Sequence, residues 1–125
     1  MRILYVDDDA EDAEIFCEAV HIIDSTIECQ IAKSGDGAIS KLYQPCPEFI
    51  FLDYRMPQKD GKQILEELRG HDCFKNTKVV MYSTFMHEIE IEECRKLGAH
   101  ECMKKSPTFS DLCNNLKKLL KGSIL

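Results

Sequence analysis

The stretch Phe49-Ile50-Phe51-Leu52-Asp53 places four apolar residues directly before an aspartate. A second apolar stretch, residues 3–6, has the same form and ends in Asp7 and Asp8. Short, continuous apolar runs of this kind are typical of strands that are buried on both faces of a parallel sheet. We therefore expect two buried strands, each of which ends at a carboxylate.

Segments typical of strands and of helices alternate along the rest of the chain. Further strands are predicted over residues 27–32, 78–82 and, more weakly, 99–103. Helical spacing of apolar residues predicts helices over about 11–23, 38–43, 64–68, 89–97 and 112–120. A turn at residues 34–37 precedes the short second helix, which Pro45 and Pro47 would end. This alternation predicts an α/β three-layer sandwich with a five-stranded parallel sheet.

The composition limits the classes of function. A chain of 125 residues fits one domain, so residues 1–125 are treated as one unit. Its net charge of −6 repels nucleic acid phosphates, and direct nucleic acid binding is not expected. No apolar run approaches the ~20 residues of a membrane span, which predicts a soluble, cytoplasmic protein without membrane insertion. The seven cysteines have no metal-binding spacing and are predicted to be reduced thiols.

Polar side chains follow the predicted strands at their carboxyl ends. Asp7 and Asp8 follow the first strand and Asp53 the third. Ser83 and Thr84 stand at the end of the fourth strand, and Lys104 and Lys105 at the end of the fifth. In an open parallel sheet these ends meet at the edge where ligands bind. Three converging carboxylates would repel one another, so a hard cation is the natural occupant, and Mg²⁺ suits such a site.

The same groups fit phosphoryl transfer. With a reference pKa of ~3.9, Asp53 is already ionised at neutral pH and can act directly as a nucleophile. A metal ion, an ammonium and a hydroxyl would neutralise the oxygens of the arriving phosphoryl group.

Four segments carry a resemblance that covers essentially the whole chain. They are ILYVDDD at residues 3–9, FLDYRMP at 51–57 with Gly61, YST at 82–84, and Gly98-Ala99 followed by Lys105. In order and spacing they resemble the receiver domain of bacterial response regulators. The resemblance implies a flavodoxin-like or CheY-like (βα)5 fold in which Asp53 is the phosphoacceptor. It also implies a site made of the metal ligands Asp7, Asp8, Asp53 and the Arg55 backbone carbonyl, with Ser83 and Lys105 binding the phosphoryl group.

The resemblance further implies a single-domain response regulator of a two-component system or phosphorelay. Such a protein is a phosphoacceptor signalling protein and not an enzyme, since it catalyses only its own phosphorylation and dephosphorylation. Its phosphoryl donor would be a sensor histidine kinase or a histidine phosphotransfer protein. Output would come from a protein-interaction surface between the fourth and fifth helices. The sequence leaves open the cognate kinase, the downstream target, the phosphoryl lifetime, whether a homodimer forms, and whether the chain is full length.

Two positions depart from the family pattern. Ser106 follows Lys105 where the family usually has proline, and Cys102 replaces an aromatic residue that reports phosphorylation in many receivers. One alternative function is therefore a pseudo-receiver that binds partners without phosphorylation. A second alternative, a phosphatase-like hydrolase, is disfavoured because Arg55 stands where such enzymes carry a second aspartate.

Overall fold

The computed structural model describes residues 1–40 and 46–124 of the chain. Five parallel strands form one sheet in the order β2-β1-β3-β4-β5. They are β1 (Arg2–Val6), β2 (Glu28–Ala32), β3 (Phe49–Leu52), β4 (Lys78–Ser83) and β5 (Glu101–Lys104). This sheet confirms the predicted fold class.

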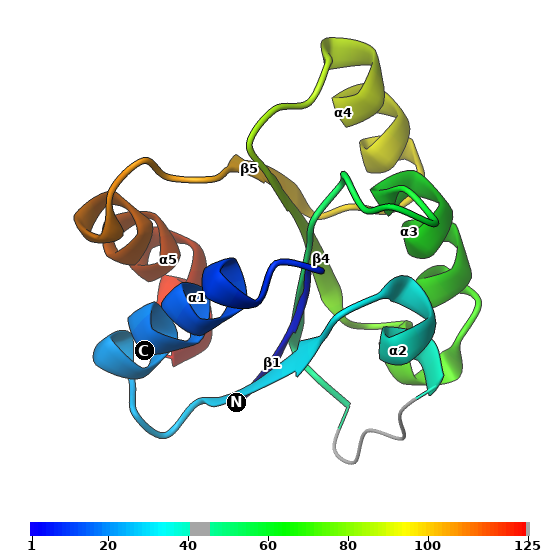
Figure 1. Ribbon diagram of the computed structural model, residues 1–125. Coiled ribbons are helices and arrows are strands. Elements are labelled where there is room, and N and C mark those ends of the chain that lie inside the picture. The colour runs from blue at the N-terminus through cyan, green and yellow to red at the C-terminus, as the bar shows by residue number, and fades with distance from the viewer. Residues whose placement is uncertain (41–45, 125) are drawn as a thin grey trace.

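Helices cover both faces of the sheet, as Figure 1 shows. On one face lie α1 (Ala10–Ile23) and α5 (Phe109–Ile124). The other face carries α2 (Gly35–Ser40), α3 (Gly61–Arg69) and α4 (Glu88–Lys96), and the 3-10 helix η1 (Asp72–Phe74) follows α3. None of the described helices is both long enough and apolar enough to cross a membrane.

The two faces of the sheet bury different kinds of side chain. Beneath α1 and α5 the core is aromatic, with Tyr5 stacked on Phe16 and with Phe51 and Tyr82 close to both. Beneath α2, α3 and α4 it is mainly aliphatic. Because each strand contributes to both cores, the strands β1, β3 and β4 are apolar at almost every position.

The chain reverses direction across the sheet at β1. From β1 it passes to β2 on one side and then returns to β3 on the other. Val6 pairs with Leu52, so the residues that follow these two strands are neighbours. The backbone N–H of Asp53 donates to the Val6 carbonyl at 3.0 Å. The carboxyl ends of β1 and β3 therefore form the crevice where open sheets of this topology bind ligands.

The second helix begins earlier than predicted. We expected a turn at residues 34–37, but α2 starts at Gly35 because the Ser34 hydroxyl accepts the N–H of Gly37 at 2.9 Å and caps the first turn. The rest of the predicted helix, with Pro45, lies outside the described residues. The fifth strand starts at Glu101 and not at residue 99, because the N–H of Ala99 still bonds the Cys94 carbonyl of α4.

The prediction that all cysteines are reduced thiols is wrong for four of them. The structure joins Cys17 of α1 to Cys29 of β2, and Cys46 to Cys73 of η1. These pairs are 12 and 27 residues apart in sequence, and tertiary packing brings them together. The remaining thiols, Cys94, Cys102 and Cys113, are free.

Gly61 fixes the position of the loop that follows β3. A Cβ atom at this residue would lie 2.8 Å from Cα of Tyr54 and 2.6 Å from Cε of Met81. The Tyr54 contact is to backbone, which cannot move aside easily. We expect Gly61→Ala to lower the free energy of unfolding by about 1–3 kcal/mol, measured by urea denaturation. The control is Gly37→Ala, whose Cβ would meet only the Ser34 hydroxyl oxygen, at 3.1 Å, and an equal loss in both variants would contradict this account.

Candidate metal centre

Three carboxylates converge at the carboxyl ends of β1 and β3. One oxygen each from Asp7, Asp8 and Asp53 lies within 4.8 Å of the others. The side chains of Asp7 and Asp53 are buried, whereas that of Asp8 is exposed. A set of hard oxygen donors that is open to solvent on one side suits a cation that keeps part of its water shell. These three side chains therefore fit a magnesium ion.

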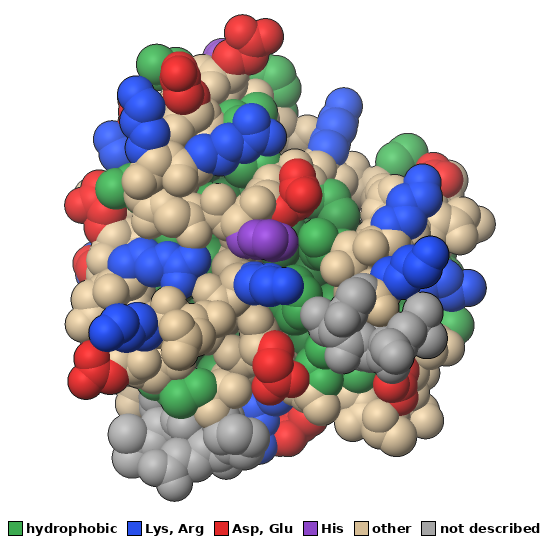
Figure 2. Space-filling view, turned by 180° about the vertical axis from the view of Figure 1, so that it is seen from behind, with side chains coloured by type: hydrophobic (Ala, Val, Ile, Leu, Met, Phe, Trp, Pro, Cys, Tyr) green, Lys and Arg blue, Asp and Glu red, His purple; other side chains and the backbone are tan. Residues whose placement is uncertain are grey.

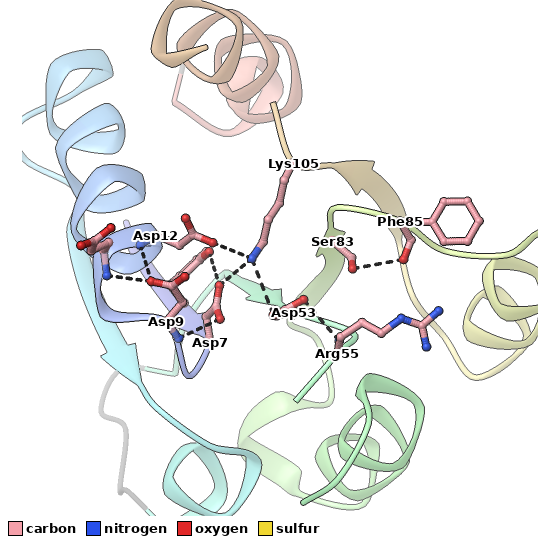
Figure 3. A network of polar contacts seen from close by, with 10 residues as sticks. Asp7, Asp9, Asp12, Asp53, Arg55, Ser83, Phe85 and Lys105 are labelled. Atoms are coloured by element: carbon pink, nitrogen blue, oxygen red, sulfur yellow. Dashed lines mark hydrogen bonds and ion pairs between the residues drawn. The ribbon is translucent and has the colours of Figure 1, made fainter. Parts of the chain in front are cut away.

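Lys105 brings a positive charge into the same site. Figure 3 shows its side chain extending from the end of β5 toward the carboxylates. Its Nζ lies 2.9 Å from Oδ2 of Asp7, 2.9 Å from Oδ2 of Asp12 and 3.6 Å from Oδ2 of Asp53. Burial lowers the pKa of Lys105, but its hydrogen bonds to Asp12 and Asp7 outweigh this effect and raise the pKa overall. Lys105 is therefore a fixed cation, whereas the neighbouring Lys104 is exposed.

Asp7 is held in the ionised form. The Tyr5 hydroxyl donates to its Oδ2 at 2.8 Å, and the N–H of Asp9 donates to its Oδ1 at 3.1 Å. Burial would raise the pKa of Asp7, but hydrogen bonds from Lys105, Asp9 and Tyr5 lower it overall. Asp9 also caps α1 through the N–H groups of Glu11 and Asp12, which places the first turn of this helix beside the site.

Asp53 has the opposite electrostatic environment. Burial raises its pKa to about 6, and the Asp7 charge adds to this effect, whereas the Lys105 charge and the N–H of Arg55 lower it. The N–H of Arg55 donates to Oδ1 of Asp53 at 3.3 Å. Asp53 is thus more easily protonated than Asp7, and a cation beside it would favour its ionised form.

Metal affinity should therefore depend on pH. Below its pKa of about 6, Asp53 carries a proton that a metal ion must displace. We expect the affinity for Mg²⁺ to fall about tenfold for each pH unit below this value and to level off above it. Isothermal titration calorimetry across this range measures the effect. An affinity that stays constant on both sides of the pKa would contradict the assignment of Asp53 as a ligand.

Ser83 and Arg55 lie beside the carboxylate cluster, but their side chains bond to groups outside it. The buried Ser83 hydroxyl donates to the Phe85 carbonyl at 3.4 Å. The Arg55 guanidinium points away from Asp53, as Figure 3 shows, and its Nη2 lies 2.8 Å from Oε1 of Glu90 in α4. The structure therefore brings Asp7, Asp8, Asp53 and Lys105 together directly. Ser83 lies near them at the end of β4, and Arg55 reaches Asp53 through its backbone N–H.

Sequence reasoning missed the two partners Asp12 and Tyr5. Asp12 is an acidic residue in the first turn of α1, and its carboxylate accepts a hydrogen bond from Lys105 at 2.9 Å. Tyr5 was assigned only to the core. Its position two residues before Asp7 puts both side chains on one face of β1, a signal that could have suggested their contact.

The comparisons with known proteins agree with this geometry. A family model described as "Response regulator receiver domain" matches residues 3–117. The chain is 30% identical over 91 residues to YvfU of Bacillus subtilis, an uncharacterised transcriptional regulatory protein, covering 73% of this chain and 44% of YvfU. The chain thus spans less than half of that relative's length.

Two solved structures are also similar. The phosphorylated cyanobacterial phytochrome response regulator RcpA superposes with a TM-score of 0.83 at 26% identity, over 96% of this chain and 91% of that one. The response regulator TrrA of Thermotoga maritima, in complex with Mg²⁺-BeF, superposes with a TM-score of 0.75 at 28% identity, over 95% and 98% of the two chains.

Proposed function

Because the chain belongs to the response regulator receiver domain family, we propose that it is a single-domain response regulator whose Asp53 accepts a phosphoryl group in a Mg²⁺-dependent reaction. The observation that carries this proposal is the convergence of Asp7, Asp8 and Asp53 with Lys105 at the carboxyl ends of the strands. In this proposal residues 1–125 act as one receiver domain. Its cytoplasmic location stays a prediction.

The proposed donor is a phosphohistidine of a sensor kinase or a histidine phosphotransfer protein. A carboxylate oxygen of Asp53 attacks the phosphorus atom, the phosphorus–nitrogen bond of the donor breaks, and the imidazole leaves with the electron pair and takes up a proton. The product is a mixed anhydride on Asp53. Bound Mg²⁺ would neutralise phosphoryl oxygens during transfer.

In this proposal, residues of the chain hold the cation and bind the phosphoryl group. Asp7 and Asp8, with the Arg55 backbone carbonyl as a further proposed ligand, hold the cation. Lys105 is already 3.6 Å from Asp53 and needs only a small movement to contact a phosphoryl oxygen. Its hydrogen bonds to Asp7 and Asp12 hold the ammonium in place before the donor arrives, so little reorganisation is required.

We propose that Ser83 transmits the phosphorylation of Asp53 to the protein surface. Its hydroxyl bonds the Phe85 carbonyl in the structure, and a phosphoryl oxygen on Asp53 would compete for that donor. The loop after β4 would then rearrange. Beside it lies a groove of about 200 Å³ whose walls include Phe85, Met86, Ile91 and Cys102. Since Cys102 cannot rotate inward as an aromatic ring would, we propose that this loop carries the signal to a protein partner.

The hydroxyl of Ser83 should matter more than that of its neighbour. We expect Ser83→Ala to slow phosphorylation by a small-molecule donor about tenfold or more, because one donor to the phosphoryl oxygens is lost. Thr84 is exposed, so Thr84→Ala removes an adjacent hydroxyl from the same loop and should change the rate less than about twofold. The rates are measured by intact-mass analysis against time, and equal rates for both variants would exclude Ser83 from the site.

The loop after Lys105 differs from the usual family pattern but is anchored. The Ser106 hydroxyl accepts from Nδ2 of Asn115 in α5 at 3.0 Å. This hydrogen bond ties the loop to α5 in the absence of proline at this position. The Ser106 departure therefore does not displace Lys105 from the carboxylates.

The experiment that tests the proposal is incubation of the protein with acetyl phosphate, with Mg²⁺ or with EDTA, followed by intact-mass analysis. We expect the gain of one phosphoryl group with Mg²⁺ and none with EDTA. No gain with Mg²⁺, under conditions that label a known receiver, would favour the pseudo-receiver, which binds partners without phosphorylation.

A further inference from the structure

A basic groove lies at the end of the sheet opposite the acidic site. Its volume is about 660 Å³, and the charged or amide side chains that line it are those of Arg69, Lys75, Asn76, Lys78, Lys96 and His100. They come from the carboxyl ends of α3 and α4, from the start of β4, and from the loops that precede β4 and β5. Its lining, as far as the described residues form it, contains no aspartate or glutamate. Figure 2 views the molecule from behind, where a histidine has basic side chains below it and to its left and an acidic side chain directly above it.

Arg69 forms a fixed part of the groove. Its Nη1 donates to the carbonyls of Phe74 and Thr77, at 3.0 and 2.9 Å, and its Nη2 donates to the Gly98 carbonyl at 2.6 Å. Gly98 has a φ of 101°, and a Cβ there would lie 3.0 Å from Nε of Arg69. One guanidinium thus ties together the segments that line the groove, which is therefore largely preformed.

The lysines of the groove lack acidic partners. In the described part of the chain, the lysines that form ion pairs are Lys59, Lys62 and Lys105. Lys75, Lys78 and Lys96 form none with the described residues. Nζ of Lys78 lies 5.7 Å from the centre of the Phe49 ring, a contact that does not neutralise its charge. The three lysine charges are therefore available to a ligand.

The dipoles of α3 and α4 explain only part of the positive charge in the groove. Arg69 and Lys96 are in the last turns of α3 and α4, where the helix dipole favours cations. Lys75, Lys78 and His100 are outside these helices. The chain as a whole carries a net charge of −6, so this local excess of cations runs against the overall composition.

We propose that this groove binds a small anion with several phosphate groups. Lysine ammonium groups are suited to phosphates as mobile point charges, and the open form of the groove leaves them accessible to a charged ligand. No Phe, Tyr or Trp among the described residues lines it, so these residues offer no ring on which a nucleobase could stack. The recognised chemistry is therefore the polyphosphate itself. The site is separate from Asp53 and does not depend on phosphorylation.

The test is an NMR titration of the full chain with inorganic tripolyphosphate, in the absence of Mg²⁺. We expect saturable shifts of the backbone amides of residues 75–78 and 96–100, and weaker binding of orthophosphate. The variant K75Q/K78Q should bind about tenfold more weakly, because two charges of the groove are lost. The control K117Q/K118Q removes the same charge from exposed positions of α5 and should change the affinity less than about twofold.

Three results would overturn the proposal. One is the absence of saturable shifts at millimolar tripolyphosphate. Another is an equal loss of binding in the two double variants, because that would reflect the overall charge and not this groove. The third is a set of shifts confined to the acidic site. Asp53→Asn should bind tripolyphosphate as the parent does, so this result and the phosphorylation result can be told apart.

Discussion

Asp53→Asn is expected to abolish labelling of the protein by acetyl phosphate. The amide has the shape of the carboxylate but lacks the anionic oxygen that attacks phosphorus, so no mixed anhydride can form. Asp8, the exposed carboxylate beside the buried Asp53, is proposed to hold the cation and should not replace Asp53. The measurement is the intact mass of parent and variant after equal incubation with acetyl phosphate and Mg²⁺.

Asp72→Asn is the matched control for this variant. Asp72 is an exposed aspartate in η1 and is not one of the residues at the carboxyl ends of the strands. The control should label as the parent does. Labelling of Asp53→Asn at the parent rate would show that another residue is the acceptor. Thermal unfolding of both variants verifies that they are folded.

Lys105→Met is expected to slow phosphorylation by about a hundredfold or more, because a preorganised charge at the reacting group is lost. The ammonium is bonded to Asp7 and Asp12 and lies 3.6 Å from Asp53. Methionine fills similar volume without the charge. Since the Lys105 charge lowers the pKa of Asp53, its loss should also raise that pKa above its value of about 6 in the parent. The rate is followed by intact mass and the pKa by carboxyl NMR titration.

Lys104→Met tests whether the effect belongs to Lys105. Lys104 is the adjacent lysine, is exposed, and forms no ion pair with a described residue. It should change the rate less than about twofold, in line with surface substitutions in general. Equal slowing by Lys104→Met and Lys105→Met would contradict the assigned role, as would an unchanged Asp53 pKa in Lys105→Met.

The strands could be predicted because of how they are buried. Residues on a strand that faces two cores are apolar throughout, so β3 was predicted with both of its ends correct at Phe49 and Leu52. The same runs mark the strand ends, which is why Asp7, Asp8 and Asp53 could be grouped from the sequence.

What the sequence did not predict depends on tertiary packing. The pairing of Cys17 with Cys29 follows from the approach of α1 to β2, and no local pattern carries that information. Asp12 meets Lys105 across 93 residues of sequence, which only the docking of α1 beside the end of β5 brings about. The ion pair between Arg55 and Glu90 similarly requires α4 to lie over the loop after β3.

The central claim is that Asp53 carries the phosphoryl group, and the most direct test is to locate that group in the labelled protein. The protein is incubated with acetyl phosphate and Mg²⁺, digested rapidly, and analysed by peptide mass spectrometry. We predict that the phosphoryl group is found on the peptide that contains Asp53 and that fragmentation assigns it to that residue. A phosphoryl group on a histidine or on another carboxylate, such as Asp8, would contradict the account.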